Sequence, residues 1–124
     1  MGLLDALMGN ASEVSIEDVQ EQLAPMLADN ESVSTAYRLV RDLIVFTSSR
    51  IVLIDKQGIS GRKVNYHSIP YKSITQFSVE TAGHFDMDSE LRVWVSGQDG
   101  PVTIELNKKA AAGVQHTLAN RLFG

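Results

Sequence analysis

Four polar residues in the second half of the chain have a spacing that could support metal chemistry: His84, Asp86, Asp88 and Glu90. Alternation would place all four side chains on one face of an extended segment, and oxygen-rich sets of this kind suit Ca²⁺ or Mg²⁺. The calcium-loop pattern fails, however, because Leu91 stands where that loop needs its turn glycine. We interpret the segment as a solvated loop and predict no metal site, with a metal-dependent hydrolase as the alternative.

Nucleophilic catalysis finds little support in the rest of the sequence. The segment 58–61, Gly-Ile-Ser-Gly, superficially resembles a nucleophile elbow, but its second glycine comes one residue too early. A hairpin turn explains it better. His67, His84 and His116 fall in different predicted elements with no shared spacing, and the chain has no cysteine. We therefore predict a protein that is not an enzyme and holds no cofactor.

Three basic residues, Lys56, Arg62 and Lys63, flank one predicted hairpin and could contact phosphate. Solvated hairpin charges are the simpler interpretation. Combined with the apolar side chains of Leu3, Leu4 and Leu7, they support an alternative function as a peripheral membrane or phospholipid-binding domain.

Charge and composition narrow the class of partner. The 124 residues carry a net charge of −4, and the basic residues are scattered rather than clustered, which argues against nucleic acid. There is no apolar run of the roughly 18 residues that a membrane span needs, and the first residues lack the basic region of a signal peptide. Gly2 suggests myristoylation, but Ala6 stands where that motif needs Ser or Thr. Together with the absence of cysteine, these features predict a cytoplasmic protein.

The first thirty residues are predicted to form a helical arm, 1–30, ahead of a domain at 31–124. Leu3, Leu4, Leu7 and Met8 fit one side of a short helix, which either lies on the chain's own surface or packs on a neighbouring subunit. Ser15 looks like the N-cap of a second helix at 16–23. Pro25 should end that helix, because its ring removes a backbone donor and clashes with the preceding turn.

The pattern then changes to strands, which are predicted at 33–40, 42–47, 50–55, 63–68, 74–80, 91–96 and 101–106. The short breaks between the early strands demand antiparallel hairpins, since a parallel crossover needs a dozen residues or more. From 108 onward Ala111, Val114, Leu118 and Leu122 follow helical spacing. Seven antiparallel strands with one terminal helix predict a mainly β, partly open barrel or two bent sheets.

Two of these strands are apolar on both faces. Residues 43–46 and 51–54 scarcely alternate, so both sides need cover. The N-terminal helix could cover these faces. Alternatively, a second subunit could cover them, and Ile44 and Phe46 would then be interface residues. Trp94 points to the same alternative, because it falls on the polar face of its strand beside Arg92.

Several segments in order resemble the bacterial pleckstrin-homology (PH) family: 41–50, 51–58, 61–63, 68–74, 77–83 and 86–91. The resemblance spans about 31–122 and implies the PH-like fold of seven strands capped by a C-terminal helix. It also implies cyclic homo-oligomers and a protein-interaction role without enzymatic activity. Eukaryotic PH domains that bind phosphoinositides use a basic loop between their first two strands, whereas here that connection is predicted to be only Arg41 and Asp42.

We therefore expect a non-enzymatic interaction module that forms a homo-oligomeric ring and binds a protein that the sequence does not identify. The polar residues near the first hairpins are the predicted partner-binding surface: Arg41, Asp42, Arg50 and Lys63. The predicted subunit interface consists of Ile44, Phe46 and Trp94. Phospholipid binding is the alternative function.

Overall fold

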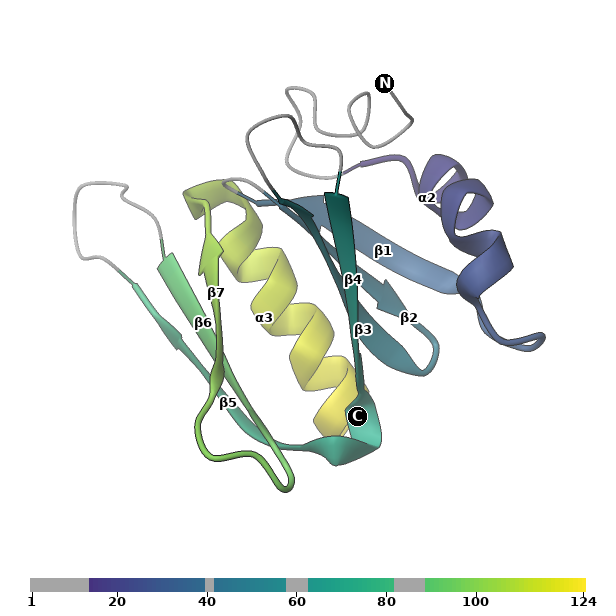
Figure 1. Cartoon of the computed structure of the whole chain (residues 1–124). Coiled ribbons are helices and arrows are strands. Elements are labelled where there is room, and N and C mark those ends of the chain that lie inside the picture. Colours follow the sequence, from purple (N-terminus) through teal and green to yellow (C-terminus); the bar gives the residue numbers. More distant parts are fainter. Residues whose placement is uncertain (1–13, 40–41, 58–62, 82–88) are drawn as a thin grey trace. The chain divides into compact units, whose positions relative to one another are not determined.

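The computed structural model describes residues 14–39, 42–57, 63–81 and 89–124, and it divides the chain into two compact units, Met1–Ser68 and Ile69–Gly124 (Figure 1). Seven antiparallel strands form two sheets rather than one closed barrel, with a short N-terminal helix and a longer C-terminal one. The predicted fold class is confirmed. The predicted helix at residues 3–8 lies outside the described residues, and the boundary at residue 31 stays a prediction.

In the first unit, helix α2 spans Ile16–Leu23 and begins at the expected cap. The Ser15 hydroxyl oxygen accepts a hydrogen bond from the Asp18 amide at 3.3 Å, which satisfies one of the free N–H groups of the first turn. The helix gives way to a 3₁₀ turn, η1, at Ala24–Met26, with Pro25 inside it. Proline ends the α-helical hydrogen bonding here as the sequence predicted.

The sheet of this unit has the order β1-β2-β3-β4, with β1 at Val33–Arg38, β2 at Leu43–Thr47, β3 at Arg50–Gln57 and β4 at Lys63–Pro70. Arg38 pairs with Leu43, so the first connection comprises residues 39–42, two more than the sequence suggested. The Leu39 amide donates to the Asp42 carbonyl at 2.7 Å and closes this turn. The connection is still short.

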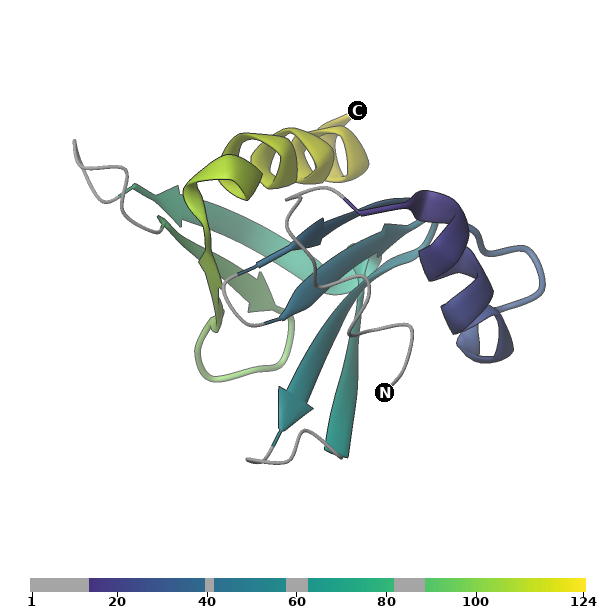
Figure 2. The same ribbon diagram turned by 90° about the horizontal axis from the view of Figure 1, so that it is seen from above.

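Helix α2 covers one face of this sheet (Figure 2). Val19 and Leu23 of the helix form one apolar cluster with strand residues Val33, Ala36, Leu43, Val45, Val52 and Ile54. The predicted helical cover is therefore confirmed for this face. On the alternate positions, Ile44 and Phe46 are also fully buried, and Phe46 meets Tyr37 edge to face with ring centroids 6.4 Å apart.

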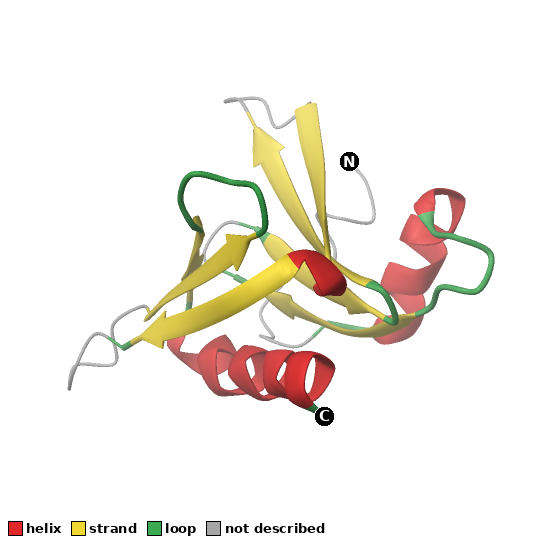
Figure 3. Cartoon of the chain, turned by 90° about the horizontal axis from the view of Figure 1, so that it is seen from below, coloured by secondary structure: helices red, strands yellow, loops and turns green. Residues whose placement is uncertain are grey.

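The second unit contains a 3₁₀ turn, η2, at Tyr71–Ser73 and a sheet of order β5-β6-β7 (Figure 3). Its strands are β5 at Ile74–Glu80, β6 at Ser89–Val95 and β7 at Val102–Leu106. Gly97, in the turn between β6 and β7, has a φ of 86°, which glycine adopts without strain. The expected alternation is observed, because Leu91, Val93, Ile104 and Leu106 are buried.

Helix α3, at Lys108–Phe123, completes the unit and contacts β5 and η2. The Asn107 side-chain oxygen caps it by accepting a hydrogen bond from the Ala110 amide at 2.8 Å. The predicted apolar stripe is confirmed for Val114 and Leu118, which are fully buried. One turn earlier Ala110 is fully buried, whereas Ala111 of the predicted stripe is half-buried.

Candidate interaction surfaces

The most concentrated polar arrangement lies in the first unit, around the carboxylate of Glu31, whose side chain is only 3% exposed. Arg50, the first residue of β3, holds it with two nitrogens: Nε lies 2.7 Å from Oε2, and Nη2 lies 2.8 Å from Oε1. This parallel, two-bond geometry matches guanidinium to carboxylate and is among the strongest pairings in proteins.

Thr47 adds a second contact to the carboxylate. Its hydroxyl donates to Oε2 of Glu31 at 2.5 Å, while the hydroxyl oxygen accepts from the backbone amides of Ser49 and Arg50 at 3.0 and 2.9 Å. The Ala28 amide donates to the other carboxylate oxygen at 3.0 Å. Since Ala28 follows η1 and Thr47 ends β2, the carboxylate joins the helical segment to the β2–β3 turn.

The guanidinium of Arg50 extends this connection. Nη2 donates to the Met26 carbonyl and Nη1 donates to the Ser68 hydroxyl, both at 2.9 Å. The set formed by Glu31, Thr47 and Arg50, here called the Glu31 clamp, therefore links η1, the β2–β3 turn and β4. No signal in the sequence indicated Glu31, because one glutamate in a polar connection normally faces water.

Electrostatics in the Glu31 clamp favour the ionised pair. Hydrogen bonds from Arg50, aided by those from Thr47 and Ala28, lower the pKa of Glu31 from 4.5 to about 2, although burial acts in the opposite direction. The hydrogen bonds to Glu31 likewise raise the pKa of Arg50. A carboxylate that holds its proton so weakly is a poor general acid or base near neutral pH, and its role is to hold the unit together.

Beside the Glu31 clamp lies a small apolar hollow of about 20 Å³, lined by Leu23, Met26, Leu27, Arg50, Val52, Tyr66 and Ser68. That volume accommodates about one water molecule. The hollow is therefore too small for a substrate.

Among the described members of the predicted partner-binding set, Arg50 is separated from Lys63. Arg41 lies outside the described residues, Asp42 is half-buried in the β1–β2 turn, and the Arg50 guanidinium is engaged in the Glu31 clamp. Lys63 is exposed at the start of β4, whereas Arg50 contacts Ser68, five residues further along that strand. At about 3.3 Å per residue, Lys63 lies roughly 16 Å along the strand from that contact. A partner contact at any of them stays a prediction.

The three predicted interface residues differ in exposure. Ile44 and Phe46 present no accessible surface in the single chain, so a second copy could touch them only after a conformational change. Trp94 is half-buried, and its strand position pairs with Gln76 of β5. Its neighbour on the same face, Arg92, forms ion pairs with Glu80 at 3.1 Å and with Glu90.

A larger, open groove of about 380 Å³ lies in the second unit, where η2 and the start of β5 meet the end of α3. It is lined by Tyr71, Lys72, Ile74, Thr75, Arg121, Leu122 and Phe123, and is here called the Phe123 groove. Phe123 is 74% exposed and stacks on Phe77, with ring centroids 6.1 Å apart. The Arg121 guanidinium carbon lies 5.6 Å from the Tyr71 ring centroid, a cation–π geometry.

The Phe123 groove was not predicted from the sequence. Two of its residues, Tyr71 and Lys72, fall in a break between strands that the sequence did not mark as functional. The Thr75 hydroxyl donates to the backbone carbonyl of Trp94 at 3.2 Å, but the Trp94 side chain belongs to the opposite face of β6 from Val93, the residue that pairs with Phe77. The groove thus gathers apolar, aromatic and basic groups on exposed surface.

The remaining sequence hypotheses fall largely outside the described residues. These are the segments that contain His84, Asp86 and Asp88, the Gly58–Gly61 turn, Arg62, and the N-terminal leucines. Glu90 is described and pairs with Arg92. In the described ranges no group of three or more acidic or histidine side chains could hold a metal ion. His67 on β4 and His116 on α3 are both exposed.

The helices of the described residues include none with the length and hydropathy needed to cross a bilayer.

Comparison with known proteins gives consistent results. The sequence model of the family described as "Bacterial PH domain" matches residues 2–122. The uncharacterized protein YjqA of Bacillus subtilis is 57% identical over 109 residues, which are 88% of this chain and 87% of that protein. A crystal structure of a PH domain from Shewanella amazonensis is 56% identical, with a TM-score of 0.85, and covers 99% of this chain and 100% of its own. A second crystal structure, of a protein with a PH domain from Shewanella loihica, is 52% identical, with a TM-score of 0.81. The match covers 93% of this chain and 99% of that chain.

Proposed function

The chain belongs to the bacterial PH domain family, and from that premise we propose that it is a non-enzymatic interaction module that assembles with further copies of itself. One observation carries the proposal: the Phe123 groove presents a 74% exposed phenylalanine together with Tyr71, Ile74 and Leu122 on one open surface. Burial of such surface against another protein is favourable by about 25 cal/mol for each Å² of apolar area. Contiguous exposed apolar groups of this kind mark interaction sites.

The polar groups of the described residues support binding rather than catalysis. The most elaborate network, the Glu31 clamp, is occupied by internal hydrogen bonds, and its carboxylate has a pKa of about 2. An acid or base suited to catalysis near pH 7 needs a pKa close to that value. The Phe123 groove offers cations and aromatic rings, which suit recognition.

A ring is the form of assembly that we propose. Repeated contact between two different patches closes into a ring when the rotation allows it, and a ring leaves no patch exposed. Trp94, half-buried on β6, is our candidate for an additional contact residue. The absence of cysteine fits a reducing compartment such as the cytoplasm.

Light scattering coupled to size exclusion tests the proposal at tens of micromolar protein. We expect a mass that is a whole multiple, greater than one, of the 13.6 kDa chain. A mass of one chain at this concentration would overturn self-assembly. Affinity capture from the source cell would then be the next measurement, because a different protein would have to fill the Phe123 groove.

A further inference from the structure

The Phe123 groove lies at the edge of a sheet. The strand order β5-β6-β7 pairs β5 with β6 on one side, and in the described part of this unit no strand lies on its other side. An edge strand presents a row of backbone N–H and C=O groups to which a further strand can add. The seven residues of β5, Ile74–Glu80, are enough to pair with a strand of ordinary length, about 5–6 residues.

The groove is placed to receive the side chains of such a strand. Phe77 of β5 pairs with the buried Val93 of β6, so both side chains lie on one face of the sheet. On that face the Phe77 ring stacks on the exposed ring of Phe123, at the end of α3. Successive side chains of an added strand alternate between the two faces. Every second one would therefore point toward the groove, where Ile74 and Leu122 add apolar contact.

The charges of the groove favour an acidic occupant. Its lining residues, all in the described part of the chain, include Lys72 and Arg121 and no carboxylate. The Arg121 guanidinium is engaged with the Tyr71 ring, so the charge argument depends on Lys72, which is exposed on η2. Unlike charges across an interface favour association, and like charges oppose it. An extended segment that carries a large apolar side chain beside a carboxylate fits both the edge and the groove.

We propose that the Phe123 groove and the edge of β5 bind an extended, acidic segment of a different protein, which adds to the sheet as a fourth strand. Backbone hydrogen bonds to β5 supply affinity, and the alternate side chains that enter the groove supply specificity. The inference rests on the function proposed above for the role of the groove as an interaction surface. A second copy would need the same groove, so a bound segment and a second copy exclude each other.

Selection from random short peptides displayed on phage tests the chemistry of the occupant. The protein is immobilised at low density, so that neighbouring copies are too far apart to fill the groove. We expect the retained peptides to combine a large apolar residue with Asp or Glu, and to lack proline in the paired stretch, because proline cannot donate to the ladder. Retention of chiefly basic peptides, or of none above an unrelated protein, would overturn the proposal.

Two groove variants locate the binding site of a selected peptide, which is synthesised with a fluorescein label for anisotropy measurements. Lys72→Glu sets like charges against each other and should weaken binding of the labelled peptide by about tenfold or more. Phe123→Ala removes the exposed apolar anchor and should weaken binding to a similar extent. Circular dichroism and thermal melting establish that both variants keep the fold.

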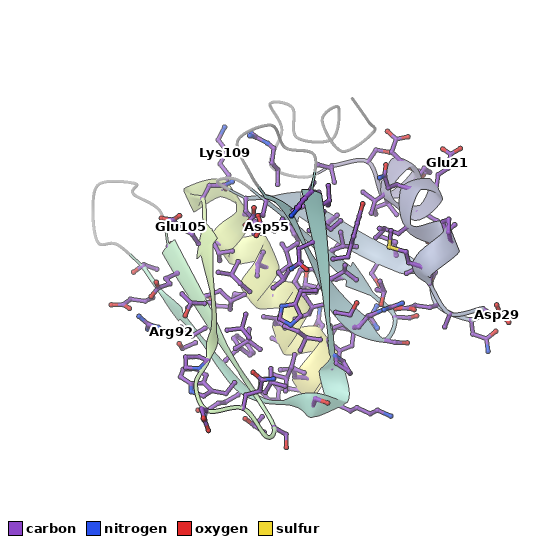
Figure 4. All side chains as sticks on the ribbon, viewed as in Figure 1. Glu21, Asp29, Asp55, Arg92, Glu105 and Lys109 are labelled. Atoms are coloured by element: carbon purple, nitrogen blue, oxygen red, sulfur yellow. The ribbon has the colours of Figure 1, made fainter. Side chains whose placement is uncertain are left out.

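Matched controls change the same residue types elsewhere. Lys109 (labelled in Figure 4) is exposed near the start of α3, roughly 21 Å along the helix from Phe123. Met26 is an exposed apolar residue of the other unit. Lys109→Glu and Met26→Ala should both bind the labelled peptide as the wild type does. Equal binding by the groove variants and the controls would contradict the proposed site.

Hydrogen exchange distinguishes strand addition from other modes of docking. Saturation with the selected peptide should slow amide exchange in the segment 74–80, because amides at the free edge of β5 become hydrogen-bonded. Slower exchange at the end of α3 with unchanged exchange in β5 would overturn strand addition.

Self-assembly and peptide binding can fail separately, because the mass of the unliganded chain measures the first and anisotropy measures the second. A wild type with the mass of one chain that binds the acidic peptide through Lys72 and Phe123 supports this inference and overturns self-assembly. An assembled wild type that retains no acidic peptide overturns this inference and leaves self-assembly standing.

Discussion

Replacing Glu31 by glutamine removes the negative charge at the centre of the Glu31 clamp while it preserves the size of the side chain. The folded-state pKa of Glu31, about 2, lies well below its ordinary value of 4.5. At about 1.4 kcal/mol per pKa unit, that difference corresponds to about 3 kcal/mol of stability at neutral pH. The side chain is only 3% exposed, so solvent screens little of this contribution.

The pH dependence follows from the direction of the shift. Because folding lowers the pKa, the stabilisation is complete above about pH 4.5 and is lost as the pH falls toward 2. Wild type should therefore exceed Glu31→Gln by about 3 kcal/mol in the free energy of unfolding at pH 7, or by about 10 °C in melting temperature. The difference between the two proteins should shrink steadily below pH 4.5.

Urea unfolding followed by circular dichroism between pH 2.5 and 7 measures both quantities. Comparing the two proteins at each pH removes the contribution of the other carboxyl groups. The exposed Glu105→Gln serves as the matched control, and its effect should stay within about 0.5 kcal/mol. A difference between wild type and Glu31→Gln that is absent at pH 7, or that stays constant down to pH 2.5, would refute the reasoning.

Four further outcomes are expected. Thr47→Val removes the hydroxyl that donates to Glu31 and accepts two backbone amides, so urea unfolding should show a loss of about 2 kcal/mol; unchanged stability would contradict this role. Leu118→Ala should cost about 2–5 kcal/mol in the same assay because the side chain is fully buried, and a cost below about 1 kcal/mol would argue against that burial. Trp94→Ala should reduce the assembled mass while the circular dichroism spectrum is kept, with a loss of about 2 kcal/mol for an interface hot spot; an unchanged mass would remove Trp94 from the interface. In co-sedimentation at physiological salt, vesicles with anionic lipid should retain no more protein than neutral vesicles, and clear enrichment would favour the phospholipid-binding alternative.

Local signals were sufficient to predict most of the fold. Ser15 and Pro25 bracket α2 because capping and proline act within one turn of their own position. The strands were recognisable because the breaks between them are too short for parallel connections. Helix α3 shows the limit of this reasoning: the sequence predicted Ala111 in its apolar stripe, whereas the fully buried residue is Ala110. Helical spacing alone does not decide between two adjacent residues at the margin of a buried face.

The functional surfaces were harder to predict because they depend on contacts between distant residues. Glu31 and Arg50 are 19 positions apart, and the pairing of Val33 in β1 with Thr47 in β2 brings the carboxylate to the β2–β3 turn. The Phe123 groove likewise combines η2 with the end of α3, about 50 residues later. Sequence reasoning named Arg50 for its charge but could not identify the buried acid that holds it.

The way in which α2 joins its sheet has a consequence for synthesis of the chain. Strand β1 stands at the edge of its sheet, where free backbone groups invite other strands to add. Here the Gln20 side-chain oxygen accepts from the Val33 amide at 2.7 Å, and the Val14 amide donates to the Ala36 carbonyl at 3.4 Å. Both partners precede β1 in the chain and leave the ribosome before it, so the groups that cover this edge are already available when β1 emerges.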